Sequence, residues 1–529
     1  MKKGIFQAIV SGALLALAFS SFNLGFLAWF GFVPVFLALK DTSLRKAFFL
    51  FLITGIVFWA GTIYWLVHVT LIGTIVLVVY LASYFAIFGL IIRPCTRQSK
   101  LWALIFIPSA WVLLEYLRTV FPILGFSWAL LGYSQYLYLP FIQIADITGT
   151  WGVSFLLMFA NVAIVELIYA LRTKQARRLA QASVLLVLFL VLVLSYGFYR
   201  INERRTTPRL RSGQADDPST SLGAGGRRIK VSVIQGNIPQ EYKWVPDYNE
   251  FIMNRYITLT AAAAADKPDL VIWPEAAFPV VLEEEPGYLQ RVKDMAAAIR
   301  APILIGTITT KDGLYFNSAV LVQPQGELSR YNKIHRVPFG EYIPLKDVLP
   351  FLETIVPIGD IAKGNEYSVF TIHPAGSSEP LNFSALICFE DVFAGLSRNF
   401  TRNGADFLVN ITNDAWYKYT SAPFQHLQAS VLRAVENRLN LARSANTGIS
   451  CFIDPTGKII SVVKDDSDRE IFVQGYKTQE ISVTRAGPSF YCRFGDWFIL
   501  ICALIALFFL VRPLVVLRHP AAPYVPPRR

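Results

Sequence analysis

Charged residues are scarce in this 529-residue chain. They make up only 16% of it, whereas a soluble globular domain carries roughly 25%. Histidine is also rare, and the five His residues form no HxH or HxxH pattern, which argues against a zinc site. No glycine-rich phosphate loop follows a predicted strand. The composition therefore argues against one ordinary soluble domain, and we expect neither a metal nor a cofactor.

Hydrophobic residues reach 54% and aromatic residues 14%, which excludes a disordered or low-complexity chain. No charged residue lies between Lys46 and Arg93. This gap holds two membrane spans of about 20 residues each, with a break near residues 68–73. We therefore predict about eight transmembrane helices, the first of them not a cleaved signal peptide because a second apolar run follows at once. The other apolar runs occupy residues 5–20, 22–39, 101–118, 152–171, 179–198 and 495–516.

The net charge of +12 is unevenly distributed along the chain. If the N-terminus lies in the cytoplasm, the predicted inner loops and tail carry 16 basic residues and one acid, Asp41, a net +15. The rest of the chain then carries 33 basic and 36 acidic residues, a net −3. This asymmetry is typical of the positive-inside rule. It places both termini in the cytoplasm and the stretch from about 200 to 494 outside it, and it removes the support for a nucleic-acid partner.

The chain divides into four predicted parts. A transmembrane bundle of about seven spans is expected over residues 1–199, followed by a flexible linker over 200–228 that is rich in Gly, Ser, Pro and Arg. An α/β domain is predicted over 229–493, because short β-rich runs alternate there with helical ones. Residues 494–529 form a final transmembrane helix and a basic tail.

Two features of the predicted bundle need an explanation. Residues 121–150 are aromatic and interrupted by Gly and Pro, so we expect a loop lying in or near the membrane interface. Glu115 and Glu166 fall inside predicted spans, where acidic side chains are costly and are functional by default. Pairing with a neighbouring helix for assembly is an equally good explanation.

Three segments of the α/β domain carry candidate chemistry. Glu275 follows a strand in Trp-Pro-Glu, Lys333 lies in a polar run, and Cys388 stands where an apolar strand meets two acids, as a nucleophile does on a strand-to-helix turn. A thiol is a poor nucleophile until it ionises. Lys333 would favour the thiolate and steady a developing oxyanion, and Glu275 would accept the proton. Glu, Lys and Cys thus form an acyl-transfer set that needs no His.

Structural explanations exist for each of these residues. A Cys in an apolar strand often fills the core, and Cys451 and Cys502 are interpreted in that way. Glu275 alone is also compatible with a helix cap or a salt bridge, and Lys333 with a solvated charge. His335 and His426 leave a Cys–His pair open. If Cys388 stays free, the outer cysteines Cys451 and Cys492 could form a disulfide.

These motifs resemble those of the nitrilase superfamily and, more closely, its membrane-bound branch, the apolipoprotein N-acyltransferases. The resemblance covers nearly the whole chain and implies an α-β-β-α sandwich outside the cytoplasm. It makes Glu275 the general base, Lys333 the stabiliser of the tetrahedral intermediate and Cys388 the nucleophile. The motifs are QGNIPQ (235–240), WPE (273–275), YNK (331–333), VPFGEY (337–342), ICFED (387–391), NDAW (413–416), PFQH (423–426) and RSANTG (443–448).

The resemblance also assigns supporting residues. Glu341 corresponds to a second glutamate that supports the site, and Phe389 replaces an expected Tyr, which keeps the ring and loses a hydroxyl. Residues 340–366 are a candidate lid, and residues 205–228 are an apparent insertion. The other residues expected to position substrate or lid are Glu390, Trp244, Asn317 and Trp416.

By this resemblance the protein is an acyltransferase of the bacterial inner membrane. It is expected to move the sn-1 acyl chain of a phospholipid, phosphatidylethanolamine, through a Cys388 thioester to the α-amino group of a diacylglyceryl-cysteine on an apolipoprotein. The reaction is ping-pong, and a monomer surrounded by membrane lipids suffices. Two alternatives are a membrane-tethered nitrilase or amidase that hydrolyses small C–N substrates, and a transporter with a binding ectodomain. The second is disfavoured because the spans show little internal symmetry.

Overall fold

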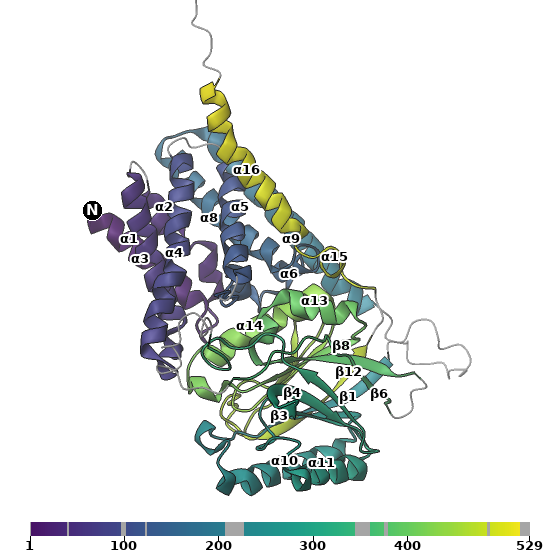
Figure 1. Ribbon diagram of the computed structural model, residues 1–529. Coiled ribbons are helices and arrows are strands. Elements are labelled where there is room, and N and C mark those ends of the chain that lie inside the picture. The colour runs from purple at the N-terminus through teal and green to yellow at the C-terminus, as the bar shows by residue number, and fades with distance from the viewer. Residues whose placement is uncertain are drawn as a thin grey trace, which may run out of the picture.

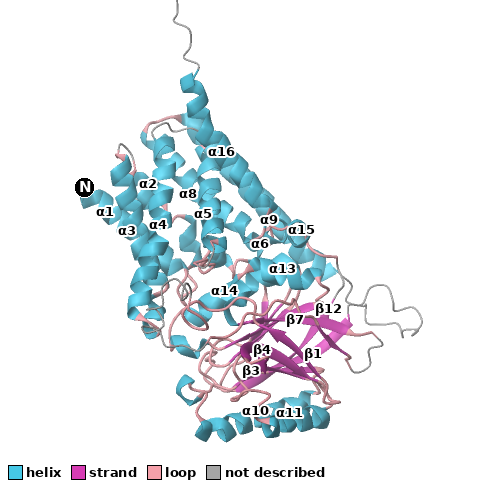
Figure 2. Ribbon diagram, viewed as in Figure 1, coloured by secondary structure: helices cyan, strands magenta, loops and turns pink. Residues whose placement is uncertain are grey.

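The computed structural model describes residues 2–39, 42–96, 102–121, 124–206, 227–343, 360–374, 379–483 and 487–518. It has two halves, a bundle of apolar helices and a pair of β-sheets with flanking helices (Figures 1 and 2). The C-terminal helix returns to the bundle and packs on α5 and α8. The chain thus crosses from helices to sheets and back to helices.

Apolar sequence without polar interruption produces the long helices of the first half. Because a helix bonds all its backbone groups internally, such segments tolerate a lipid environment. Among the described residues, five helices are long and apolar enough to cross a membrane: α3, α4, α5, α8 and α9. The long helices of this half are α1 (Lys2–Ala18), α3 (Leu44–Thr62), α4 (Leu71–Thr96), α5 (Ala103–Val120), α8 (Thr150–Arg172), α9 (Ala176–Thr206) and α16 (Trp497–Arg518).

The number of spans differs from the predicted eight. Helix α1 has 17 residues, and the described apolar part of α16, Trp497–Phe509, is also short, so these two spans stay predictions. The run predicted as a span over 22–39 is not a single helix, and it too stays a prediction as a span. It is broken into the 3₁₀ helix η1 (Gly25–Trp29) and helix α2 (Val33–Ala38), because Pro34 favours a new helix start. The predicted break near 68–73 lies at the 3₁₀ helix η2 (Tyr64–His68), just before α4.

The aromatic stretch 121–150, predicted as a loop in or near the membrane interface, is partly helical and partly buried inside the protein. Its described residues form three short helices, η3 (Leu131–Gln135), α6 (Leu139–Ile142) and α7 (Ala145–Thr148). Trp128 and Tyr133 are buried. The Tyr133 hydroxyl donates to the carbonyl of Val392 in the second half at 3.2 Å. The segment therefore fills the contact between the two halves.

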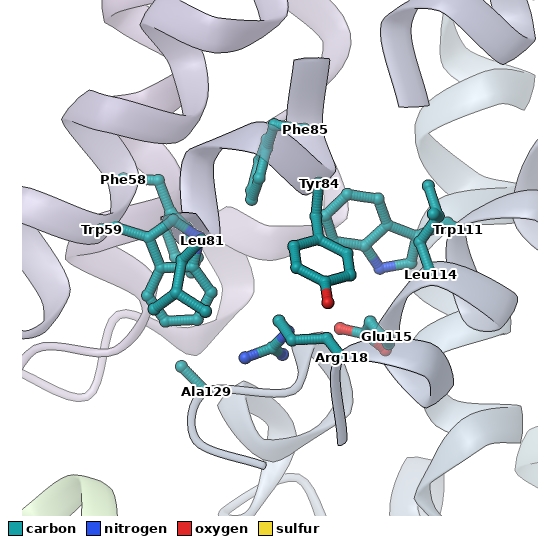
Figure 3. Close-up of a pocket in the computed structure, with 10 residues that line it drawn as sticks. All are labelled: Phe58, Trp59, Leu81, Tyr84, Phe85, Trp111, Leu114, Glu115, Arg118 and Ala129. Atoms are coloured by element: carbon teal, nitrogen blue, oxygen red, sulfur yellow. The ribbon is translucent and has the colours of Figure 1, made fainter. Parts of the chain in front are cut away.

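A small cavity lies among α3, α4 and α5, and Glu115 and Arg118 are its charged lining residues (Figure 3). Glu115 accepts a hydrogen bond from the backbone N–H of Leu131 at 2.7 Å. Arg118 donates to the carbonyls of Phe126 and Trp128 at 2.9 and 2.8 Å. Both side chains thus anchor the segment after α5, which favours assembly as their role. Glu166 likewise forms an ion pair with Arg178 of α9.

The second half contains two six-stranded sheets, ordered β12-β1-β2-β3-β4-β5 and β11-β10-β9-β8-β7-β6. The central strands of each sheet run parallel, β1 to β3 in the first and β7 to β9 in the second. The outer strands pair antiparallel. The strands of the first sheet are β1 (Arg227–Gln235), β2 (Leu270–Ile272), β3 (Ile303–Lys311), β4 (Leu314–Val322), β5 (Leu328–Asn332) and β12 (Gly475–Val483). Those of the second are β6 (Phe370–Ile372), β7 (Leu381–Ile387), β8 (Phe407–Thr412), β9 (Leu441–Ala445), β10 (Cys451–Ile453) and β11 (Ile459–Val462).

The two sheets face each other and helices cover their outer faces (Figure 2). Helices α10 (Asn249–Ala263) and α11 (Pro286–Ile299) cover the first sheet, and α13 (Ala394–Arg402) and α14 (Ala422–Asn437) cover the second. The layers are thus α-β-β-α. Buried apolar side chains of β1, β7, β8 and β9 fill the space between the sheets. Strand ends from both sheets consequently meet at one edge of the sandwich.

Helix α14 connects the sandwich to the helical bundle through a buried polar contact. The Gln425 carbonyl oxygen accepts from the indole N–H groups of Trp65 and Trp128 at 3.1 and 2.8 Å. Its amide donates to the carbonyl of Thr62 at 2.9 Å. The halves therefore share a fixed interface. The predicted linker, apart from the end of α9 and the start of β1 at Arg227, lies outside the described residues.

Candidate active site

Glu275, Lys333 and Cys388 come together where strands of the two sheets end. Glu275 follows β2, Lys333 follows β5 and Cys388 follows β7. Their exposed fractions are 7%, 1% and 8%. Three ionisable side chains from separate segments are therefore enclosed in one low-dielectric site, where their mutual interactions are strong.

The Glu275 carboxylate is held by three donors. Oε1 accepts from the Asn317 amide at 2.9 Å and lies 3.5 Å from Lys333 Nζ. Oε2 accepts from the backbone N–H of Asn413 at 3.0 Å. This arrangement keeps the carboxylate in one orientation, as a general base requires.

Lys333 is paired with a second carboxylate. Its Nζ lies 2.9 Å from Glu341 Oε1, which also accepts from the Asn317 amide at 2.7 Å. Burial lowers the pKa of Lys333, but Glu341 and Glu275 outweigh it and raise the pKa above its ordinary value. The ammonium also lies 5.4 Å from the centre of the Phe389 ring. Lys333 is therefore a permanent cation at the site.

Cys388 begins the 3₁₀ helix η7 (Cys388–Val392) with a φ of +56°. This left-handed backbone is rare for a residue with a side chain and is typical of a strained functional turn. The Cys388 carbonyl accepts from the Asn410 amide at 3.0 Å, and Thr412 Oγ1 lies 3.6 Å from Sγ. The turn thus contacts side chains of the neighbouring strand β8.

The side chain of Cys388 is a neutral thiol. Burial and then the charge of Glu275 raise the pKa of Cys388 well above its ordinary value, and Lys333 only partly opposes them. The sequence led us to expect that Lys333 favours the thiolate. Lys333 does lower the pKa of Cys388, but the rise in pKa caused by burial is larger. Cys388 consequently needs a base, and Glu275 is the neighbouring carboxylate.

Glu390 links the turn at Cys388 to the segment that carries Lys333. Its Oε1 accepts from the backbone N–H groups of Ile334 and His335 at 2.8 and 2.9 Å. Its Oε2 accepts from Ile387 N–H at 2.8 Å. Burial raises the pKa of Glu390 to about 7, although these donors oppose the rise. Glu390 therefore holds the residues next to Lys333 and Cys388.

Two of the predicted supporting residues lie outside this enclosed set. Trp244 and Trp416 are 44% and 54% exposed. Trp244 directly follows Lys243, which donates to the Glu275 carbonyl at 3.3 Å. Trp416 comes three residues after Asn413, whose backbone N–H donates to the Glu275 carboxylate. The indoles are thus placed at the surface beside the site. Most of the predicted lid, residues 344–359, lies outside the described residues.

Sequence reasoning missed a buried charged network behind Cys388. His426 Nδ1 lies 2.9 Å from Asp414 Oδ1, and its Nε2 lies 3.0 Å from Asp391 Oδ1 and 3.3 Å from the Cys388 carbonyl. Arg443 lies 3.1 and 3.4 Å from the two aspartates. The PFQH and RSANTG motifs supply His426 and Arg443 and were the signal available in the sequence.

This network excludes the Cys–His alternative. His426 faces the backbone of Cys388 and two carboxylates, and the ring of His335 stacks on Phe393 with 4.2 Å between ring centres. The pairing considered for the outer cysteines is also absent, since Cys451 and Cys492 are both free thiols.

A two-sheet sandwich with a buried Glu, Lys and Cys at its strand ends is the architecture of the carbon–nitrogen hydrolases, and residues 230–482 match the family model described as Carbon-nitrogen hydrolase. Residues 11–163 match that of the Apolipoprotein N-acyltransferase N-terminal domain. The chain is 39% identical to the Apolipoprotein N-acyltransferase of Geobacter metallireducens, over 95% of this chain and 93% of the relative. It is 31% identical to that of Rickettsia prowazekii, over 80% and 82%. The chain belongs to the apolipoprotein N-acyltransferase family and is an acyltransferase.

The similar solved structures are more distant. Saccharomyces cerevisiae Nit3, a member of branch 10 of the nitrilase superfamily, is 18% identical with a TM-score of 0.36, and covers 49% of this chain and 91% of its own. An amidase from Nesterenkonia sp. is 17% identical with a TM-score of 0.38, and covers 55% of this chain and 99% of its own.

Proposed function

We propose that this protein transfers an acyl chain from a phospholipid, through a thioester on Cys388, to the α-amino group of the N-terminal diacylglyceryl-cysteine of an apolipoprotein. The observation that carries the proposal is the enclosed set of Glu275, Lys333 and Cys388 in a domain that packs directly on apolar helices. Both substrates carry acyl chains. A nucleophile held at the membrane reaches them without moving an acyl chain into water.

The first half-reaction forms the acyl-enzyme. The Glu275 carboxylate takes the Cys388 proton as the sulfur attacks the sn-1 ester carbonyl of phosphatidylethanolamine. Lys333 stabilises the oxyanion of the tetrahedral intermediate, a contribution typically on the order of 10²–10³ in rate. The C–O bond then breaks, and Glu275 returns the proton to the departing lysophospholipid.

The second half-reaction transfers the acyl chain to the amine. The neutral α-amino group attacks the thioester carbonyl and Glu275 accepts its proton. The C–S bond then breaks, and Glu275 returns the proton to the departing Cys388 sulfur, which restores the thiol. Asn317 and Glu341 keep Glu275 and Lys333 in place throughout. Glu390 and Phe389 hold the turn at Cys388. Trp244 and Trp416 line the entrance for the substrate.

The same proposal includes the arrangement in the cell. The parts are the bundle 1–199, the linker 200–228, the catalytic domain 229–493 and the final helix with its tail, 494–529. The catalytic domain lies on the periplasmic side of the bacterial inner membrane with both termini in the cytoplasm, which the charge asymmetry supports. The protein works as a monomer, and membrane lipids and the apolipoprotein are its partners.

Mass spectrometry of the purified full-length protein with phosphatidylethanolamine tests this function. We expect a hydroxylamine-sensitive mass increase of one acyl chain on Cys388, because thioesters are cleaved by hydroxylamine. Adding a diacylated lipopeptide should discharge the adduct onto the peptide amine. The C388S variant, which keeps the shape and lacks the thiol, should show no hydroxylamine-sensitive adduct. Active protein without the adduct, or release of ammonia from small amides with no acyl transfer, would contradict the proposal.

A further inference from the structure

Lys243 is a buried cation that the reaction described above does not use. It lies between the 3₁₀ helices η4 (Gln240–Tyr242) and η5 (Pro246–Tyr248) and is 5% exposed. Its Nζ donates to the backbone carbonyls of Ala276 and Glu275 at 3.0 and 3.3 Å. No carboxylate of the described residues forms an ion pair with it. An ammonium without an ion-pair partner is thus enclosed beside the proposed base.

Such a position is costly for an ammonium. Removing a charged group from water costs several kcal/mol even after the protein relaxes. Burial lowers the pKa of Lys243 to about 7, whereas Glu275 and Cys388 both raise it. Two backbone carbonyls alone need only a neutral donor. The charge of Lys243 therefore needs a reason of its own.

The charge balance of the site provides that reason. Glu275 and Glu341 contribute two negative charges, and Lys333 contributes one positive charge. When Glu275 takes the Cys388 proton, the negative charge moves to the sulfur or to the oxyanion, and the total is unchanged. With Lys333 alone the site therefore holds a net −1 throughout, whereas a protonated Lys243 brings the total to zero.

We infer that Lys243 is a positioning residue of this site, which fixes the backbone of Glu275 and supplies a second positive charge that balances the two carboxylates as negative charge moves to Cys388 or to the oxyanion. The inference rests on the proposed acyl transfer. No covalent step involves Lys243, since Glu275 still moves the proton and the C–S bond still forms and breaks at Cys388. Lys243 directly precedes Trp244. Its contact with the Glu275 carbonyl therefore also holds the surface loop that carries the Trp244 indole next to Glu275.

Three substitutions separate the two parts of this role. K243Q keeps hydrogen-bond donors and removes the charge, K243R keeps the charge, and K243M removes both. K477Q is the matched control, because Lys477 is an exposed cation on the edge strand β12. All are measured as full-length protein in detergent, with the thermal midpoint recorded for each.

The first measurement is the rate at which iodoacetamide alkylates Cys388 between pH 6 and 10, which requires no acyl transfer. By reciprocity, a cation whose pKa Cys388 raises must favour the thiolate. We expect the K243Q and K243M profiles to move to higher pH and K477Q to stay close to the wild type. K243R keeps its charge above about pH 7, so its profile should lie at the wild-type position or at lower pH. The groups that face this thiol and contribute to the same profile are Glu275, Lys333 and Asp414.

The second measurement is the single-turnover rate of thioester formation with phosphatidylethanolamine. We expect K243Q to be about 10- to 100-fold slower, somewhat less than the loss of a direct oxyanion donor. Above about pH 7, where Lys243 loses its proton, K243R should form the thioester faster relative to the wild type.

The outcomes are distinguishable. If K243Q alkylates with the wild-type profile, the inference is wrong, whatever the thioester assay shows. If K243R is as impaired as K243M and both lose thermal stability, Lys243 only holds the fold and its charge has no role. If the wild type alkylates as described but never forms a thioester, the proposed function fails while the electrostatic role of Lys243 stands.

Discussion

Replacing His426 by Gln tests the buried network behind Cys388. In the folded protein Asp391 and Asp414 raise the pKa of His426 to about 9, although burial and Arg443 lower it. Protonated His426 and Arg443 together neutralise the two aspartates. The H426Q variant leaves one buried negative charge uncompensated. We therefore expect it to be strongly destabilised at neutral pH.

The magnitude follows from the pKa. A rise from 6.5 to about 9 corresponds to about 3 kcal/mol, because one pKa unit is about 1.4 kcal/mol. Since the folded pKa lies above the ordinary value, this stabilisation is complete below about pH 6.5 and is lost as the pH rises through about 9. For a domain of this size, 3 kcal/mol changes the thermal midpoint by about 10 °C.

Thermal unfolding of the full-length protein at pH 6 and pH 9.5 measures the effect. The thermal midpoint of the wild type should fall between pH 6 and pH 9.5. The midpoint of H426Q should be about 10 °C below that of the wild type at pH 6 and should fall less by pH 9.5. H373Q, at an exposed histidine, is the control and should follow the wild type. An H426Q protein with the wild-type midpoint at pH 6, or with the same loss on going to pH 9.5, would refute the argument.

Two further predictions concern contacts of the site and of the interface. E341Q keeps the side-chain shape but removes the charge paired with Lys333. Thioester formation should therefore slow on the order of 10²-fold, with little change in the thermal midpoint. A wild-type rate of thioester formation would contradict this role of Glu341. Q425L leaves the indole N–H groups of Trp65 and Trp128 without their acceptor, which should cost about 2–5 kcal/mol. Q428L is its control on the same helix, because the Gln428 side-chain oxygen has no partner within the described residues. Equal midpoints for Q425L and Q428L would show that the interface does not depend on Gln425.

Local sequence pattern was sufficient for the elements and for the choice of candidate residues. Alternating β-rich and helical runs predicted a layered α/β domain. Strand-terminal positions indicated Glu275 and Cys388, and a polar run indicated Lys333. The pattern was insufficient for the bundle, because hydropathy does not distinguish a spanning helix from apolar residues packed inside the protein. Residues 22–39 and 121–150 are as apolar as spans but form short helices.

The sequence by itself determined where the chain is apolar, where it is charged and which residue types stand at strand ends, because these depend on residues close together along the chain. Only the tertiary structure decided what desolvation does to those residues. It made Cys388 a resting thiol, kept Lys333 charged and enclosed Lys243 beside Glu275. Burial and charge proximity arise from segments distant along the chain, so no local pattern encodes them.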